Sequence, residues 1–319
     1  MGSLILRRVG QAVVVLLGVS FLTFLLLNLL PGNVINSILG PGATPAAVAR
    51  LRVELGLNQN LFLRYLHWLG SAAHGNLGTS LATGQSVAGI IVQRLPVTAE
   101  IVILAEIVAL AGSIPLAFVA ARRAGQRVDR LIAGGSLVFI SVPAFVPGIL
   151  LILIFGADLK VLPATGWVNL SQSLGGNLRT AIMPVVTLAL GGFAVHGRLL
   201  RAELVAQSEQ EYATAALARG LRWPDVMRWH VARNSMIPLI TNLALHFGAL
   251  IGGTVIVEQL FGIPGVGQLL INSIDARDTT VVEGIVLLTA VAFMVGNLLA
   301  DILHTAIDPR VRYAGATAG

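Results

Sequence analysis

The sequence is poor in charged residues. Of its 319 residues 11% are Asp, Glu, Lys or Arg, against roughly 25% in a soluble domain, while 55% are hydrophobic and the mean hydropathy is +0.84. Such a chain needs lipid as its solvent. Because its apolar runs are continuous, and because backbone groups must be paired in hydrocarbon, we expect helices and an all-α membrane fold.

Cysteine is absent and lysine nearly so. A chain without cysteine cannot form disulfides, thiolate-bound iron–sulfur clusters or a thiol nucleophile. The single lysine, Lys160, does not stand in a G-x-x-x-x-G-K-[ST] motif, so the sequence contains no Walker-type loop to bind the phosphates of ATP. H-E-x-x-H, a Cys/His cluster and a nucleophile elbow are absent as well. We therefore predict no enzyme activity, no catalytic residue, no cofactor bound by this chain and no metal site.

Long apolar runs are what the sequence does contain. A helix needs about 20 residues to cross a hydrocarbon core of roughly 30 Å. Pro143 and Pro147 fall in the third run and should kink it, because proline removes a backbone donor. The first run has no A-x-A site after it and is interpreted as a retained helix and not as a cleaved signal peptide. The six predicted spans are Val9–Leu30, Leu95–Ala121, Leu131–Gly156, Ala181–Leu200, Met236–Val257 and Val281–Ile307.

The distribution of arginine predicts the orientation of these spans. Cytoplasmic loops of membrane proteins retain positive charge. Of the 21 Lys and Arg residues, 14 fall on one side, mostly within Arg122–Arg130 and Arg198–Arg233. We therefore predict that both termini are cytoplasmic. The expected organisation is an N-terminal transmembrane helix in residues 1–30, an external region at 31–94, and a core of five further spans at 95–319 with a cytoplasmic loop at about 201–235.

The external region has the pattern of two short helices. Thr44 can cap the first, with Pro45 at its first position and Gly56 at its end. A second helix is predicted at Leu61–Ala73, where Tyr65 suits the membrane interface. The pattern fits a solvated cap on the bundle and a docking surface equally well.

The internal loop between the fourth and fifth runs has the pattern of a helix, a turn and a second helix. Gly220 can end the first helix in the left-handed conformation, and Pro224 can begin the second. Tyr212, Ala216 and Arg219 fall on one face, at a spacing of i, i+4 and i+7. A short helix pair suits a surface that receives force from a separate soluble subunit, although an interfacial helix joining two spans would have the same pattern.

The same loop resembles the EAA loop of ABC importer permeases, in the branch that transports dipeptides, oligopeptides and nickel. The family pattern is E-A-A followed by Gly and later by a hydrophobic residue, any residue and Pro. Further stretches are similar to the family: Gly75–Gly78, Leu95-Pro96, Glu258–Phe261 with Pro264–Gly267, and Asp308–Arg312. The resemblance indicates these coupling-loop residues: Glu211, Tyr212 in place of the first Ala, Ala213, Ala216, Gly220, Arg233, Asn234 and Pro238.

The resemblance implies a place, a function and a set of partners. The chain would be a polytopic permease of about six transmembrane helices in the bacterial inner membrane, with a cytoplasmic coupling-helix loop. It would form the translocation path of an ATP-driven importer for peptides or related solutes. The implied partners are a second, homologous permease subunit, two cytoplasmic ATP-binding-cassette ATPase subunits that use ATP and Mg²⁺, and an external solute-binding protein. No nucleic acid is expected.

Polar and ionisable side chains stand out at three positions within the predicted spans. A charge at membrane depth costs on the order of 2.5–3.5 kcal/mol, so each needs a partner or a water-filled path. Glu106 in the second run either lines the translocation path or bonds a neighbouring helix. His246 in the fifth run is interpreted as a helix–helix hydrogen bond and not as a proton relay, because no second histidine stands beside it; both residues remain candidates for the path. A polar stripe of Asn297, Asp301 and His304 in the sixth run is interpreted as structural.

A Gly-x-x-x-Gly motif, Gly248 to Gly252, lies in the fifth run. Small residues at this spacing let two helices approach closely. The motif is therefore a packing device and a candidate contact between two permease subunits.

Two other functions fit a bundle of spanning helices. A secondary transporter driven by an ion gradient would show inverted repeats and paired acidic residues at mid-membrane depth, and neither is apparent. A membrane scaffold without transport would account for the helices but not for the helix, glycine, helix pattern of the internal loop. The identity of the solute stays open, because the external binding protein largely selects it.

Overall fold

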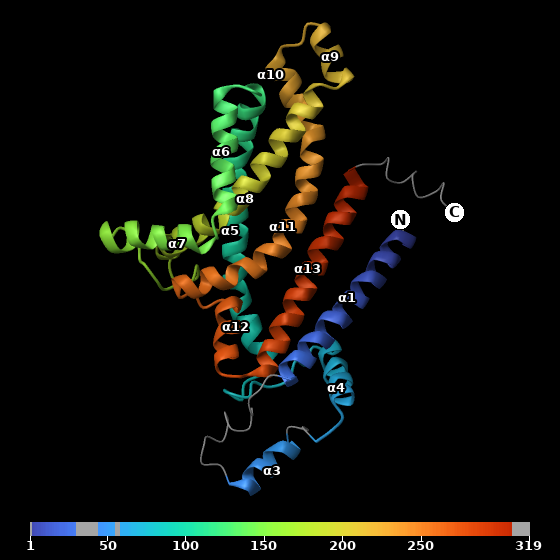
Figure 1. Ribbon diagram of the computed structural model, residues 1–319, viewed down its shortest axis with the longest axis vertical. Coiled ribbons are helices and arrows are strands. Elements are labelled where there is room, and N and C mark those ends of the chain that lie inside the picture. Colours follow the sequence, from blue (N-terminus) through green and yellow to red (C-terminus); the bar gives the residue numbers. More distant parts are fainter. Residues whose placement is uncertain (1, 30–43, 55–57, 308–319) are drawn as a thin grey trace. The chain divides into compact units, whose positions relative to one another are not determined.

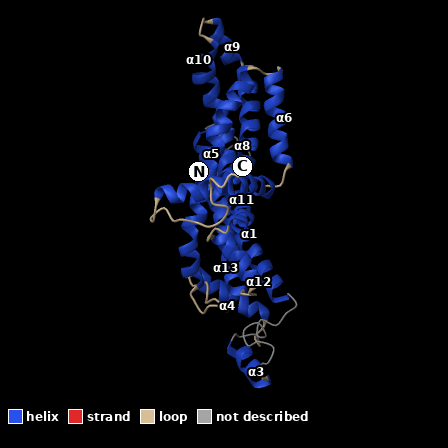
Figure 2. Ribbon diagram, turned by 90° about the vertical axis from the view of Figure 1, so that its left-hand side faces the viewer, coloured by secondary structure: helices blue, strands red, loops and turns tan. Residues whose placement is uncertain are grey.

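The structure is a computed structural model that describes residues 2–29, 44–54 and 58–307. All regular structure in these ranges is helical, apart from an isolated antiparallel bridge between Thr79 and Ser86. Figures 1 and 2 show long helices and no strand in the part that is drawn as ribbon. The predicted all-α class is confirmed.

Among the described residues, five helices are long and apolar enough to cross a membrane. They correspond to five of the six predicted spans, and several extend beyond the apolar run, because a helix can continue past the hydrocarbon core into water. They are Arg8–Leu29 of α1 (Gly2–Leu29), α5 (Val87–Arg122), α8 (Leu174–Ser208), the helix from Trp223 to Phe261 that includes α11 (Ala232–Phe261), and Thr279–Ala300 of α13 (Thr279–Ile307).

The third predicted span is broken in two. α6 (Arg127–Ser141) ends before Pro143, and α7 (Phe145–Leu151) followed by the π-helical η1 (Ile152–Asp158) continues at an angle of 98°. Val142 is extended, with φ −90° and ψ 128°, as the residue before a proline prefers. The proline-induced bend is confirmed and is close to a right angle. The pair is therefore a broken span or a re-entrant loop, and not the continuous helix that the apolar run suggested.

Contacts divide the chain into two compact units. The first comprises the described parts of residues 99–263 and 293–319, and the second those of residues 2–98 and 264–292. α5 and α13 contribute residues to both units. The second unit has its own apolar core, where α5, α12 (Val266–Asp275) and α13 meet; its buried members are Val87, Ile91, Val266, Val281 and Ile285.

The core of the first unit lies between α8 and α11. α8 buries residues along most of its length, from Asn177 to Leu204, because it packs against α6, α7 and α11. A small residue brings α7 close to this pair. A Cβ added to Gly148 of α7 would lie 2.7 Å from the Leu260 side chain of α11 and 3.1 Å from that of Thr187 on α8. Gly148 therefore sets the distance at which α7 crosses the two helices.

A bidentate ion pair joins α6 to α8 in the first unit. Arg201 Nε donates to Asp129 Oδ1 over 2.9 Å, and Arg201 Nη2 donates to Asp129 Oδ2 over 2.6 Å. Asp129 is buried and also accepts the backbone N–H of Gly125. Arg201 was among the arginines used to predict the orientation of the spans. It also holds α6 against α8, because its planar guanidinium matches the geometry of the carboxylate.

Both short helices predicted for the external region are present in the second unit. α3 (Pro45–Glu54) begins at Pro45, and the hydroxyl of Thr44 accepts a backbone N–H of its first turn over 3.3 Å. Gly56, predicted to end this helix, lies outside the described residues. α4 spans Leu61–Ala73, as predicted.

Tyr65 of α4 packs against α1, a contact that the sequence did not predict. Its hydroxyl lies 2.8 Å from Ser20 Oγ and donates to the Leu17 carbonyl over 3.2 Å. The rings of Phe21 and Phe24 meet it edge to face. The Tyr65 side chain is buried, so this aromatic cluster attaches α4 to α1.

Asp278 connects the segment before α5 to the start of α13. It accepts hydrogen bonds from the Ser80 hydroxyl and from the backbone N–H groups of Leu81, Ala82 and Val281. Gly78 precedes this segment with φ 87°, and a Cβ added to it would lie 2.9 Å from the Thr280 side chain. Gly75 also has positive φ. The Gly75–Gly78 stretch is therefore a left-handed turn held against α13.

Two predicted features lie wholly or partly outside the described residues. They are the Asp308–Arg312 stretch and, in the polar stripe, the side chains of Asp301 and His304. Asn297, the first residue of the predicted polar stripe, is half-buried. The stripe stays a prediction.

Gly248, the first glycine of the Gly-x-x-x-Gly motif, makes a close contact within the chain. A Cβ added to it would lie 2.6 Å from the Phe293 ring and 3.2 Å from Phe293 Cα, on α13. In return, a Cβ added to Gly296 of α13 would lie 3.0 Å from the Ala244 carbonyl oxygen of α11. Gly252 has no atom within 4 Å of its Cβ position. The motif therefore packs α11 against α13 through Gly248.

We expect Gly248→Ala to destabilise the protein and Gly252→Ala to leave it equally stable or more stable. A methyl group at position 248 has no room beside Phe293, and such overpacking costs about 1–3 kcal/mol. Alanine at an open helical position is more favourable than glycine by about 0.5–1 kcal/mol. Thermal unfolding of both variants in the same detergent measures the difference, and equal melting temperatures would contradict the role of Gly248.

Candidate functional site

A short helix follows the end of α8 in the first unit. α8 stops at Ser208, and α9 (Glu211–Ala218) begins after Gln210. Glu211 is the first residue of α9, where a carboxylate is stabilised by the N-terminal end of the helix dipole. Figure 1 shows α9 beyond the ends of α8 and α11.

Two alanines attach α9 to the first unit. Ala213 is 1% and Ala216 5% exposed, whereas Tyr212 and Arg219 are exposed. The face of α9 that packs therefore carries Ala213 and Ala216, and not Tyr212 or Arg219. Because alanine is small, α9 lies close to its neighbours. α9 contacts α8 and α10 (Trp223–Val226), and its two alanines belong to a buried cluster to which α5, α8, α10, η2 (Met227–Val231) and α11 also contribute. The other buried members of this cluster are Ala117, Ala121, Leu200, Leu204, Val226, Met227, Val231, Ala232 and Leu239.

Gly220 ends α9 in the left-handed conformation that its position predicted, with φ 87°. Its N–H donates to the Leu217 carbonyl over 2.9 Å, and the Leu221 N–H donates to the Ala216 carbonyl over 3.3 Å. These two bonds form the Schellman motif, which satisfies carbonyls at the end of a helix. No atom lies within 4 Å of a Cβ built on Gly220, so the requirement for glycine comes from the backbone conformation.

The helix after Gly220 belongs to a long span. Helical structure continues from Trp223 to Phe261, so the predicted second helix of the loop is the beginning of a spanning helix. Pro224 occupies its second position, one residue later than predicted. The Arg122 guanidinium of α5 lies over the Trp223 ring, 5.7 Å from its centroid. α9 is therefore followed, after the turn at Gly220, by a helix that is long and apolar enough to cross a membrane.

The other residues predicted for the coupling loop lie on α9 and on the first turns of α11. The Tyr212 hydroxyl donates to Gln207 Oε1 of α8 over 2.8 Å. Pro238 lies inside α11, where its missing N–H deprives the Asn234 carbonyl of its usual helical donor. The exposed residues of the predicted set are Glu211, Tyr212, Gly220, Arg233 and Asn234.

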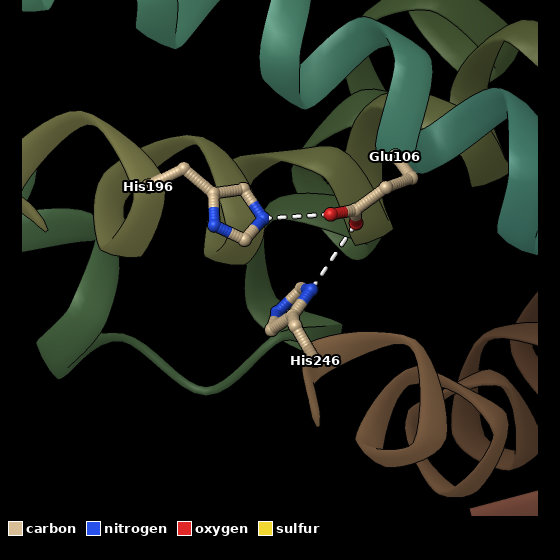
Figure 3. A group of neighbouring side chains, drawn as sticks. All are labelled: Glu106, His196 and His246. Carbon is tan, nitrogen blue, oxygen red and sulfur yellow. Dashed lines mark hydrogen bonds and ion pairs between the residues drawn. The ribbon is translucent and has the colours of Figure 1, made fainter. Parts of the chain in front are cut away.

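A second group of candidate residues lies inside the first unit. Figure 3 shows Glu106 of α5 between His196 of α8 and His246 of α11. Glu106 Oε1 lies 2.8 Å from His196 Nε2, and Glu106 Oε2 lies 3.1 Å from His246 Nδ1. The two imidazole rings meet edge to face, with their centroids 4.7 Å apart. One carboxylate thus joins three helices, and the two imidazoles offset the cost of burying it.

His196 is the residue that the sequence analysis missed. The interpretation of His246 assumed that no second histidine stands beside it, which was wrong, because His196 packs against it and is fully buried. One signal was present: His196 lies inside the fourth predicted span, where an ionisable side chain needs a partner. Of the two roles open to Glu106, a bond to neighbouring helices is observed, and lining of the translocation path stays a prediction.

Family comparisons cover both ends of the chain. Residues 113–313 match the family described as the binding-protein-dependent transport system inner membrane component. Residues 1–102 match the N-terminal region of such membrane components. The two matches together leave few residues unassigned.

Relatives match the chain along its whole length. A protein of Brucella abortus (strain 2308) whose name assigns it to a peptide transport system is 39% identical over 98% of this chain and 100% of its own. The oligopeptide transport system permease protein AppB of Bacillus subtilis (strain 168) is 32% identical over 98% and 100%. The glutathione transport system permease protein GsiC of Salmonella typhimurium (strain LT2) is 35% identical over 97% and 98%.

A solved structure has the same fold. The crystal structure of an amino acid ABC transporter aligns with a TM-score of 0.52 at 17% identity, over 68% of this chain and 94% of that chain. The family matches favour neither an ion-gradient transporter nor a scaffold. The chain belongs to the binding-protein-dependent transport system inner membrane component family, and it is the multi-pass permease subunit of an ABC transporter, not its ATPase.

Proposed function

We propose that this permease forms the translocation path for a peptide or a related solute, and that α9 receives the movement of separate ATPase subunits. The proposal rests on how α9 is attached to the first unit. The helix is held by two buried alanines, ends in a tight turn and is followed by a spanning helix, while Glu211 and Tyr212 are exposed on it. The peptide and glutathione systems named for the relatives support the solute class.

The family implies ATPase and binding-protein partners. We infer that two ATPase subunits bind ATP and Mg²⁺, because this sequence has no loop to hold the phosphates. A second, homologous permease would complete the translocation path. The external binding protein would deliver the solute and largely select it.

The orientation is also a proposal. Arg122 ends α5 and Arg127 begins α6, and Arg122 reaches Trp223 at the start of the helix that follows α9. The same region holds Arg201, which pairs with Asp129. This concentration of arginine near α9 supports a cytoplasmic position for α9 and for both termini.

Cysteine labelling tests the orientation. Because the native sequence has no cysteine, single cysteines at Ala49 and Ser171 should react with an impermeant thiol reagent from outside, without background. A cysteine at the exposed Ala215 of α9 should react only after permeabilisation. External labelling at Ala215 would reverse the proposed orientation and remove α9 from the reach of an ATPase.

A substitution at Gly220 tests the coupling. Valine at φ 87° costs about 1–2 kcal/mol, and the strain is relieved by re-aiming the segment between α9 and Trp223. Gly220→Val should therefore abolish uptake while the chain still reaches the membrane. Uptake into vesicles and substrate-stimulated ATPase activity of the complex measure the effect, alongside the level of the chain in the membrane.

Gly125→Val is the matched control for Gly220→Val. Gly125 has φ 77° and no atom within 4 Å of its Cβ position, so the substitution imposes similar strain outside α9. It should leave most of the uptake intact. Normal uptake with Gly220→Val, or equal loss in both variants, would count against coupling through α9.

Charge reversal at Glu211 tests whether α9 pairs with a basic group on the ATPase. Glu211→Arg should lower uptake more than Glu211→Gln, because reversal turns attraction into repulsion. Glu209→Arg, an equal change at an exposed residue just before α9, is the control and should have the smaller effect. If Glu211→Arg and Glu211→Gln reduce uptake equally, the carboxylate acts on the helix and not on a partner.

A further inference from the structure

Glu106, His196 and His246 are a set of metal-ligand side chains that the proposed coupling through α9 does not use. One nitrogen from each histidine and one carboxylate oxygen all lie within 4.8 Å of one another. The side chain of His196 is 0% exposed, that of Glu106 10% and that of His246 19%. The sequence predicted no metal site because the three residues come from three separate helices, with no metal-binding spacing.

The space around the two imidazoles depends on a glycine. A Cβ added to Gly192 of α8 would lie 3.0 Å from His246 Cε1 and 3.4 Å from His196 Nε2. It would also lie 3.3 Å from the Cβ of Ala109, which stands next to Glu106 on α5. The absence of a side chain at position 192 therefore lets both rings approach one carboxylate.

Two imidazoles and a carboxylate suit a borderline transition-metal ion. Zn²⁺ binds histidine nitrogen at about 2.0–2.1 Å and carboxylate oxygen at about 2.0–2.2 Å, so neighbouring ligands of a tetrahedral ion are about 3.3 Å apart. His196 and His246 contact different oxygens of Glu106, at 2.8 and 3.1 Å, and the three ligand atoms lie within 4.8 Å of one another. Binding therefore has to draw these atoms together by up to about 1.5 Å to reach a tetrahedral spacing. Ca²⁺ and Mg²⁺ prefer oxygen ligands alone, so this set discriminates against them.

We propose that Glu106, His196 and His246 bind one divalent transition-metal ion of the Zn²⁺ type, with the fourth position left to a water molecule. The ion links α5, α8 and α11, because each helix supplies one ligand. Its charge compensates the buried carboxylate, and its binding displaces protons from the ligands. The site is separate from the α9 attachment, so its failure would leave the proposed coupling untouched.

Zinc titration of the full-length permease tests the site. The chain is purified without a polyhistidine tag, placed in lipid nanodiscs and titrated with ZnCl₂ in a calorimeter, with MgCl₂ as the comparison ion. Because the chain has no cysteine, thiolates do not compete. We expect one Zn²⁺ per chain at micromolar concentration, a higher unfolding temperature with Zn²⁺, and no response to Mg²⁺.

Substitution of the proposed ligands tests where Zn²⁺ binds. His246→Asn and Glu106→Gln should each weaken Zn²⁺ binding more than about tenfold, since loss of a supporting contact alone costs 10–100-fold. His67→Asn combined with His74→Asn, outside the site, is the control and should bind as the wild type does. Unfolding temperatures without metal show whether each variant folds, and His246→Asn, at the most exposed of the three ligands, is the mildest change. Wild-type protein that binds no Zn²⁺, or His246→Asn and Glu106→Gln that both fold and bind it unchanged, would overturn the proposal.

Discussion

In hydrocarbon every backbone N–H and C=O needs a partner within the protein, and the arrangement of this permease depends on that constraint. It accounts for the helical structure of the described ranges and for the small number of interruptions in the long helices. The interruptions fall at Pro143 and at the π-helical segments η1 and η2. Because η2 lies between α9 and the apolar length of α11, a change in its backbone bonding would alter how α9 acts on that helix.

The pair of α8 and α11 connects the two candidate sites. Leu204 of α8 and Leu239 of α11 belong to the cluster that holds α9, while His196 and His246 on the same helices meet Glu106. His196 lies eight residues before Leu204, which is about 12 Å along a helix. The α9 attachment and the contacts of the carboxylate therefore depend on the same two helices, although no residue belongs to both. The two sites are physically linked even though their chemistry differs.

Capping residues, prolines and glycines predicted where short helices begin and end. The bounds of α4, the start of α3 at Pro45 and the left-handed Gly220 all follow from residues close in sequence. The break before Pro143 was predicted as a kink, but its size was not, because the bend depends on Gly148 fitting between Leu260 and Thr187. Which face of α9 packs was not predicted, for the same reason: alanine is neutral in a hydropathy pattern, and its burial depends on what lies opposite.

The sequence by itself determined the membrane class, the number and place of most spans, the position of α9 and its turn, and the resemblance to importer permeases, because composition and short-range spacing carry that information. Tertiary structure alone decided which side chains meet. Glu106, His196 and His246 lie on three different helices, and Asp129 of α6 pairs with Arg201 of α8. No spacing along the chain encodes such contacts, since each depends on how two helices are rotated and how closely glycine and alanine let them approach.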